Sequence, residues 1–288
     1  MNNKGLYIMN CKKIIFFLVL VVFTNLTFAQ NLNNEKSNSP FELSLAVDIP
    51  LGITSLTTFA LSQFIKQEQI VYNPNEIRNL NSVNSFDRWM AQPYSKNVDI
   101  TSDVLMYLTL CTPFTLFATN SSEYLTWGTM YLEAFTLAFG LKDLIKLGVY
   151  RERPYMYFEN KPMEEITEGD YHNSFLSGHT TLSFMGASFG SYVFSKYFPE
   201  SKWKVPVIMG SFSLAAITST LRMIGGCHFL SDVLAGATLG TVIGIGVPFL
   251  HELNSIINRK INNKIDDDKI EQASINLLPN SIYCVIKL

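Results

Sequence analysis

The amino-acid sequence predicts an all-α protein, a membrane-embedded bundle of about six helices. Of its 288 residues, 48% are apolar and only 16% are charged, whereas ordinary soluble domains have roughly 25% charged residues. Six stretches contain at most one charged residue each, and a membrane helix needs roughly 20 apolar residues to cross the hydrocarbon core. These stretches are 49–65, 100–119 (with Asp103), 125–141 (with Glu133), 180–195, 205–221 and 233–250.

The N-terminal segment, residues 1–29, has the pattern of a secretory signal. Lys12 and Lys13 precede an unbroken apolar run at 14–23, and small residues occupy the −3 and −1 positions before Gln30. The alternative is an N-terminal anchor helix that is not cleaved. Either reading sends the chain to or through a membrane.

The rest of the chain divides into a flexible leader at 30–44, a membrane domain at 45–250 and a charged tail with a short apolar terminus at 251–288. Within the membrane domain, Phe86 and Trp89 have helical spacing, with Asp87 and Arg88 on the other side. This pattern suits a short amphipathic segment at the membrane interface; an ordinary surface loop is the alternative. Glycines in the last apolar stretch predict close helix packing: Gly236, Gly240, Gly244 and Gly246.

Polar residues gather at the ends of the apolar stretches. One cluster follows the third stretch, one opens the fourth, and one joins the fifth to the sixth. Because consecutive membrane helices run in opposite directions, all three clusters share one face of the bundle. Their candidate site residues are Lys146, Arg153, Ser177, Gly178, His179, Arg222, His228 and Asp232.

The positive charges in these clusters predict a phosphate pocket. Arginines such as Arg153 and Arg222 bind phosphate oxygens through two N–H groups, and Lys146 acts as a point charge. Ser177 and Gly178 open a helix, so backbone N–H groups there can also face an anion. Taken singly, each residue fits a structural role, such as a helix-end lysine with its charge in the interface. The joint pattern favours a catalytic site.

The histidines predict covalent catalysis. His228 and Asp232 are four residues apart and lie on one face if the segment is helical. A carboxylate there can hold the imidazole in one tautomer, so that the other nitrogen attacks the substrate. His179, on another helix, can protonate the leaving oxygen.

These motifs resemble those of the type-2 phosphatidic acid phosphatase superfamily, whose core is similar to that of vanadium haloperoxidases. The family pattern is Lys, six residues, Arg-Pro; then Pro-Ser-Gly-His; then Ser-Arg, five residues, His, three residues, Asp. The segments 146–154, 177–179 and 222–232 match it in spacing. Leu176 replaces the family proline and Leu221 replaces the family serine. Neither replacement removes a side chain that makes or breaks bonds.

The resemblance implies a lipid phosphatase that needs no metal or other cofactor. In the family the second histidine attacks phosphorus, the aspartate supports it and the first histidine is the acid. Phosphatidic acid, phosphatidylglycerol phosphate, undecaprenyl pyrophosphate and lipid A phosphates remain open as substrates. The alternatives are a non-catalytic lipid-phosphate binder or transporter, and a vanadate-dependent haloperoxidase-like enzyme. The expected partners are a lipid phosphate and the bilayer, with no nucleic acid.

The expected location is a bacterial inner membrane with the site facing the periplasm, because the tail carries basic residues that prefer the cytoplasm. Other polar residues have plainer interpretations. Glu133 is expected to form a contact between helices, with a substrate role as the alternative. His172 is expected on the surface, with the pocket mouth as the alternative, and His251 needs no special role. Cys227 is expected to be a small core residue.

Overall fold

The computed structural model describes residues 39–65, 72–74, 76, 78–159, 161–272, 275–278 and 281–284, with side chains described as far as residue 264. The predicted signal segment at 1–29 lies outside the described residues.

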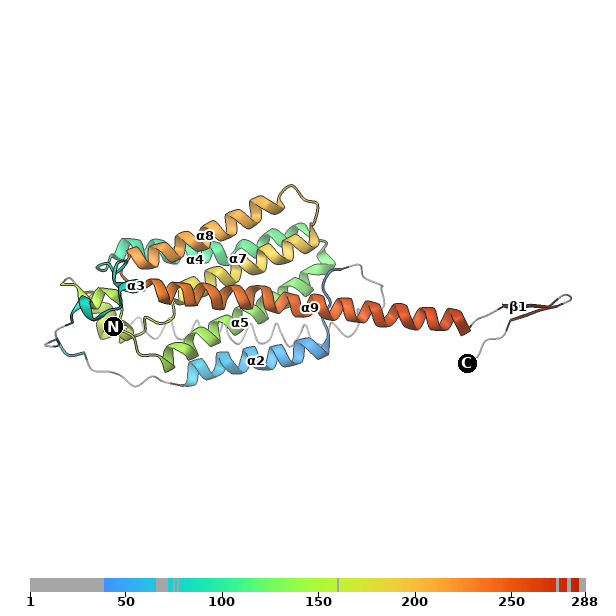
Figure 1. Cartoon of the computed structure of the whole chain (residues 1–288), viewed down its shortest axis with the longest axis horizontal. Coiled ribbons are helices and arrows are strands. Elements are labelled where there is room, and N and C mark those ends of the chain that lie inside the picture. The colour runs from blue at the N-terminus through green and yellow to red at the C-terminus, as the bar shows by residue number, and fades with distance from the viewer. Residues whose placement is uncertain are drawn as a thin grey trace, which may run out of the picture.

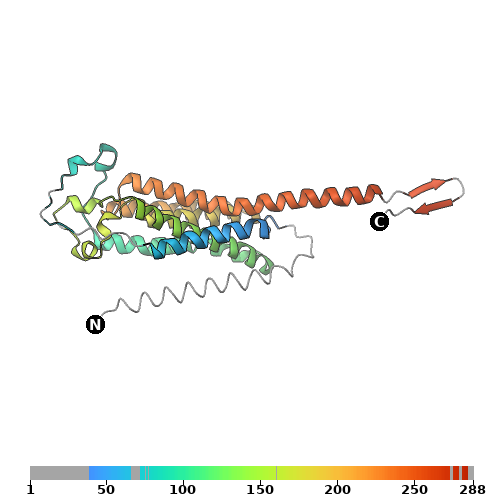
Figure 2. The ribbon, with the colours of Figure 1, turned by 90° about the horizontal axis from the view of Figure 1, so that it is seen from below.

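Six long helices form the body of the described structure, and their axes run side by side along its long dimension (Figures 1 and 2). Each overlaps one of the six charge-poor stretches, which confirms the predicted all-α bundle. The helices are α2 (Leu45–Phe64), α4 (Lys96–Leu110), α5 (Tyr124–Gly148), α7 (Gly178–Tyr197), α8 (Lys204–Ile224) and α9 (Leu230–Gln272).

Shorter elements connect the long helices at the two ends of the bundle. The α2–α4 and α5–α7 connections lie at the same end (Figure 1) and contain η1 (Leu80–Ser82), α3 (Ser85–Arg88), η4 (Pro154–Tyr157), α6 (Met163–Thr167) and η5 (Asp170–His172). The opposite end contains η2 (Thr112–Ala118) and η3 (Ser121–Glu123). After α9, β1 (Ile275–Leu278) and β2 (Ser281–Cys284) pair as an antiparallel hairpin.

Four helical segments among the described residues are long and apolar enough to cross a membrane: Leu45–Phe64, Lys96–Ala118, Lys204–Ile224 and Leu230–Lys264. The helices α5 and α7 are more polar because other helices surround them. α7 packs against α4, α5, α8 and α9, and most of its residues are buried. A helix shielded from lipid in this way can carry serine, threonine and glycine.

Helices α7 and α9 approach closely through three glycines of α9. A Cβ atom on Gly236 would lie 2.6 Å from the backbone oxygen of Ser177, and one on Gly244 would lie 2.5 Å from that of Met185. Gly240 meets the α7 backbone even more closely. Gly246 has open space around its Cα and takes no part, contrary to the sequence prediction. The spacing of four residues therefore brings the first turns of α7 and α9 together.

Two predicted boundaries are wrong. Residues 39–44 of the expected flexible leader lie against the bundle, where Phe41 is buried and its ring lies 5.4 Å from that of Tyr197. The tail does not begin at residue 251, because α9 continues without a break to Gln272. The first charged residues of the predicted tail are therefore part of the bundle's longest helix.

Candidate active site

The eight predicted site residues all lie at the end of the bundle that carries the two long connections. Lys146 is in the last turn of α5 and Arg222 in the last turn of α8. Arg153 caps η4, and Ser177 caps α7 ahead of Gly178 and His179. His228 lies between α8 and α9, and Asp232 is in the first turn of α9. The alternating helix directions thus gather the three sequence clusters, as predicted.

Direct contacts tie these clusters to one another. The backbone N–H of Ser177 donates to the backbone oxygen of Asp232 at 3.1 Å. A Cβ on Gly178 would lie 3.8 Å from Nζ of Lys146, so the lysine ammonium lies close to the first turn of α7. That turn offers backbone N–H groups without partners in the helix, and the lysine adds positive charge beside them.

The imidazole of His228 is fully buried, and its orientation is set by Ser174. Nδ1 of His228 lies 2.7 Å from the backbone oxygen of Ser174. A carbonyl oxygen can only accept, so Nδ1 carries the hydrogen and the lone pair of the neutral ring is on Nε2. Asp232 does not make the expected direct hydrogen bond, because its Oδ2 is 3.9 Å from Nδ1.

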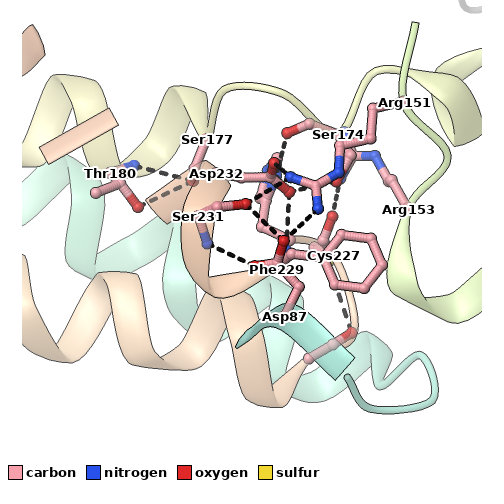
Figure 3. A network of polar contacts seen from close by, with 12 residues as sticks. Asp87, Arg151, Arg153, Ser174, Ser177, Thr180, Cys227, Phe229, Ser231 and Asp232 are labelled. Atoms are coloured by element: carbon pink, nitrogen blue, oxygen red, sulfur yellow. Dashed lines mark hydrogen bonds and ion pairs between the residues drawn. The ribbon is translucent and has the colours of Figure 1, made fainter. Parts of the chain in front are cut away.

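Asp232 acts on His228 through Ser174 instead. Its Oδ2 accepts a hydrogen bond from Oγ of Ser174 at 2.6 Å and one from the backbone N–H of Phe229 at 2.8 Å (Figure 3). Ser174 therefore links the carboxylate to the carbonyl that holds the imidazole. Asp232 fixes the loop segment rather than the ring itself.

Arg151 and Asp87 extend this network, and the sequence analysis missed both. Arg151 donates to Asp232 through Nη1 and lies 2.6 Å from Oδ2 of Asp87 through Nη2. Asp87 also accepts from the backbone N–H of Ser231 at 2.8 Å. The signal was present in the sequence as a second arginine inside the Lys146–Pro154 segment, two residues before Arg153.

The placement of Asp87 shows which side of its helix faces the protein. Asp87 is 1% exposed, whereas Phe86 and Trp89 are 53% and 67% exposed. The aromatic side chains therefore lie on the surface of the described structure, and the carboxylate points into the site. An amphipathic segment is present, with its polar side facing the protein.

Both arginines of the predicted phosphate pocket lie next to carboxylates. Nη2 of Arg153 is 2.5 Å from Oδ2 of Asp170. Arg222 donates through Nη1 to Asp99 and, at 2.9 Å, to Oγ of Ser102. Nε of Arg222 is buried and has no hydrogen-bond partner among the described residues. Leaving a buried donor of this kind without a hydrogen bond is costly, and a phosphate oxygen can accept that bond.

Charges around the site act on two of its titratable groups. Burial raises the pKa of Asp170, but the Arg153 and Lys146 charges lower it more, so the net pKa is below its ordinary value. Burial lowers the pKa of His228 well below its ordinary value. The charges of Arg153, Arg222 and Lys146 lower the pKa of that imidazole further. All three predicted cations are thus close enough to His228 to act on it, and the ring is neutral at pH 7.

His179 faces a carboxylate that the sequence analysis did not assign to the site. Nε2 of His179 lies 2.6 Å from Oδ1 of Asp103, and the same oxygen is 3.9 Å from Nη1 of Arg222. This contact with Asp103 sets the orientation of the ring. The side chain of Ser177 caps α7, since its Oγ accepts from the backbone N–H of Thr180 at 3.4 Å, and it also accepts from the hydroxyl of that residue at 2.9 Å.

Two neighbouring residues differ in how well they were predicted. His172 is 5% exposed and stacks on the ring of Tyr150, so the predicted surface position is wrong. Cys227 is buried as predicted, and burial raises the pKa of its thiol to about 11.

A cavity of about 390 Å³ opens beside the site. Tyr94 is in its lining and donates to Oδ2 of Asp99 at 2.9 Å, which connects the cavity wall to the partner of Arg222.

Comparisons with known proteins show what this chain is similar to. The PAP2 superfamily model matches residues 127–255. A PA-phosphatase related-family protein of Dictyostelium discoideum is 27% identical over 169 residues, which is 54% of this chain and 62% of that protein. The chain thus spans about three fifths of the length of this curated relative.

Two solved structures are similar to this chain. One is a transmembrane PAP2 type phosphatidylglycerolphosphate phosphatase from Bacillus subtilis, with a TM-score of 0.40, 19% identity, and coverage of 82% of this chain and 96% of that one. The other is Aquifex aeolicus LpxE, with a TM-score of 0.38, 21% identity, and coverage of 63% and 98%. The match to the PAP2 superfamily model covers residues 127–255, which contain all three motifs, and over that segment the chain is similar to the PAP2 superfamily.

Proposed function

We propose that this protein hydrolyses a lipid phosphomonoester or pyrophosphate without a metal, through a phosphohistidine on His228. The observation that carries the proposal is the hydrogen bond from Nδ1 of His228 to the carbonyl of Ser174. This bond occupies Nδ1, so the free lone pair is on Nε2, which is the proposed nucleophile. Three cations that can hold the phosphate lie close enough to act on the ring. A buried, neutral imidazole is suited to attack phosphorus.

The proposed reaction has two displacements at phosphorus. Nε2 of His228 forms a bond to phosphorus while the bond to the lipid oxygen breaks, and His179 gives that oxygen a proton. Water then attacks the phosphohistidine, releases inorganic phosphate and restores the free imidazole, with His179 accepting the proton. Arg153, Arg222 and Lys146 stabilise the negative charge on the transferring group in both steps.

A site at the end of membrane helices suits a lipid substrate, because the headgroup can enter while the acyl or prenyl chain stays in the bilayer. The resemblance to the family leaves phosphatidic acid, phosphatidylglycerol phosphate, undecaprenyl pyrophosphate and lipid A phosphates as candidates. A non-catalytic lipid-phosphate binder is the second candidate. It would need the cations but not the Asp232–Ser174–His228 arrangement, which therefore favours catalysis.

We further infer a bacterial inner-membrane location with the site facing the periplasm. Basic residues of the far end of α9, Arg259, Lys260 and Lys264, favour the cytoplasm at the opposite end of the bundle. A cleaved signal leaves the new N-terminus outside, which fits this orientation only if residues 45–66 do not fully cross the membrane. The length and composition of α2 suit a full crossing, so an uncleaved N-terminal anchor fits the proposed orientation better.

The proposal is tested with purified protein in detergent–lipid micelles and a panel of lipid phosphates. Phosphate release should continue in excess chelator and stop with vanadate, which imitates five-coordinate phosphorus. His228→Ala should abolish release while still binding the lipid. Complete loss of wild-type activity in chelator, with recovery in Mg²⁺, would contradict the metal-free mechanism. Lipid-phosphate binding without any turnover would favour the binder instead.

A further inference from the structure

A second cluster of ionisable side chains lies far from the candidate active site. It consists of Asp48 in the first turn of α2, Glu133 in α5 and His251 in α9. Along α5, Glu133 is about 20 Å from Lys146 at about 1.5 Å of rise per residue. The cluster therefore belongs to the opposite end of the bundle, where α2 begins (Figure 1).

All three side chains are buried. Asp48 is 8% exposed, Glu133 is 7% exposed and His251 is fully enclosed. Nε2 of His251 is 3.0 Å from Oε2 of Glu133, which confirms that Glu133 forms a contact between helices. Nδ1 of His251 is 3.7 Å from Oδ1 of Asp48 and 3.3 Å from the backbone oxygen of Glu42.

The hydrogen bonding of this cluster is incomplete. Oδ1 of Asp48 is buried, points to His251 and has no hydrogen-bond partner among the described residues. Oγ of Ser44 and Nδ2 of Asn254, each within about one helical turn of a cluster residue along the chain, are also buried without such a partner in the described part. Buried polar atoms are normally satisfied, so this concentration indicates a missing ligand.

The charges point to a cation. With both carboxylates ionised and the imidazole neutral, as metal ligands are, the cluster carries two negative charges at the end of a membrane bundle, where unpaired buried charge is expensive. A divalent cation balances them. Carboxylate oxygen and imidazole nitrogen are ligands of Zn²⁺, and one donor atom from each of the three residues lies within 4.8 Å of the others. Within the described residues, no other three His, Cys, Asp or Glu side chains meet this condition.

We propose that Asp48, Glu133 and His251 bind a divalent transition-metal cation of the Zn²⁺ class, which clamps α2, α5 and α9 together. Binding displaces any second proton from the imidazole, since a metal takes the place of a proton on the coordinating nitrogen. The role is structural, because the cluster has no contact with the proposed phosphate pocket.

The test uses the full chain, purified in detergent with a histidine-free tag, stripped with chelator, incubated with Zn²⁺ alone and then desalted. Elemental analysis should find about one Zn²⁺ per chain. Asp48→Asn, Glu133→Gln and His251→Gln should each weaken Zn²⁺ binding by at least about 100-fold, because even changes to groups around a metal's ligands cost about 10–100-fold. His228→Asn removes a buried histidine at the other end and should retain the ion.

A second measurement does not depend on the variants. The Tm of the wild-type protein should rise with Zn²⁺ concentration, because a ligand that binds only the folded state stabilises it. The Tm of any folded ligand variant should respond much less. A wild-type protein that retains no Zn²⁺ and shows no shift in Tm would overturn the proposal and leave the cluster as a proton-carrying ion pair. Retention of Zn²⁺ by all three ligand variants would also overturn it.

Discussion

Nδ1 of His228 lies 2.7 Å from the backbone oxygen of Ser174, and the hydroxyl of the same serine lies 2.6 Å from the carboxylate of Asp232. One loop residue thus connects the proposed nucleophile to its acidic partner. The sequence spacing of four between His228 and Asp232 predicts a direct contact between their side chains. The structure shows that this spacing places the aspartate under the loop that holds the histidine.

The two histidines should respond differently to the leaving group. His228→Ala removes the nucleophile, so both a lipid phosphate and an activated aryl phosphate should remain uncleaved. His179→Ala removes the acid, so cleavage of the lipid should fall by about 10²–10⁴-fold, while the aryl phosphate, which leaves as a stabilised phenolate, should lose much less. The measurement is the ratio of kcat/KM values for the two substrates. Selective rescue of the His228 variant by the aryl phosphate would reverse the assigned roles.

Removing a cation should change both the rate and its pH dependence. Arg153→Ala should lower kcat/KM by about 10²–10³-fold, as loss of other transition-state stabilisers does. Burial and nearby cations lower the pKa of His228, so wild-type kcat/KM should stay level as pH falls through 6.5 and decline only at lower pH, when the ring gains a proton. Without the Arg153 charge, that acid limb should move to higher pH.

The control for this prediction is Arg88→Ala, because Arg88 donates to Asn81 on the surface and not to the site. Its pH profile should match that of the wild type. An acid limb that stays in place in Arg153→Ala, with a folded protein, would mean that the charge of Arg153 does not act on the nucleophile.

Arg151 and Asp87 should behave as positioning residues. Arg151→Lys cannot bridge Asp232 and Asp87 through two N–H groups, and Asp87→Asn weakens the same bridge. A small displacement of reacting groups can cost about 10²-fold, so kcat should fall by about that factor with little change in KM. Arg88→Lys is the matched control. A rise in KM by a similar factor, with kcat unchanged, would indicate a substrate contact instead of a positioning role.

Accessibility tests the proposed orientation. In a background lacking the four native cysteines, Glu164→Cys places a thiol on α6 at the site end, where the glutamate side chain is 79% exposed. A membrane-impermeant thiol reagent should label it in cells whose inner membrane is intact. Lys202→Cys, in the α7–α8 connection at the opposite end, should be labelled only after that membrane is opened. The reverse result would place the site in the cytoplasm.

The bundle could be predicted from the sequence because its evidence is local. Charge-poor stretches of membrane length gave the six helices, and their alternation placed Lys146, His179 and Arg222 on one face. The spacing of Lys146 and Arg153 likewise depends on a single segment of chain. Features of this kind can be predicted without knowing which helices are neighbours.

Residues whose role depends on distant partners were not predictable in this way. The sequence places Asp87 on the polar side of an amphipathic segment, but it does not show that Arg151 lies beside it. His251 follows the last apolar stretch and appeared to start a solvent-exposed tail. Its burial arises because α9 continues past Leu250 and packs against α5 and α2. Only the tertiary arrangement reveals these pairings.

The glycines at 236, 240 and 244 have a consequence for how the protein responds to its bilayer. Backbone atoms, rather than flexible side chains, set the separation of α7 and α9. His179 is the second residue of α7, and His228 lies two residues before α9 begins. Membranes of different hydrocarbon thickness force exposed helices to tilt, and large apolar side chains are exposed on α2, α4, α8 and the outer side of α9. The α7–α9 pair would move as one body, so the distance between the two histidines is insulated from the acyl-chain length of the surrounding lipids.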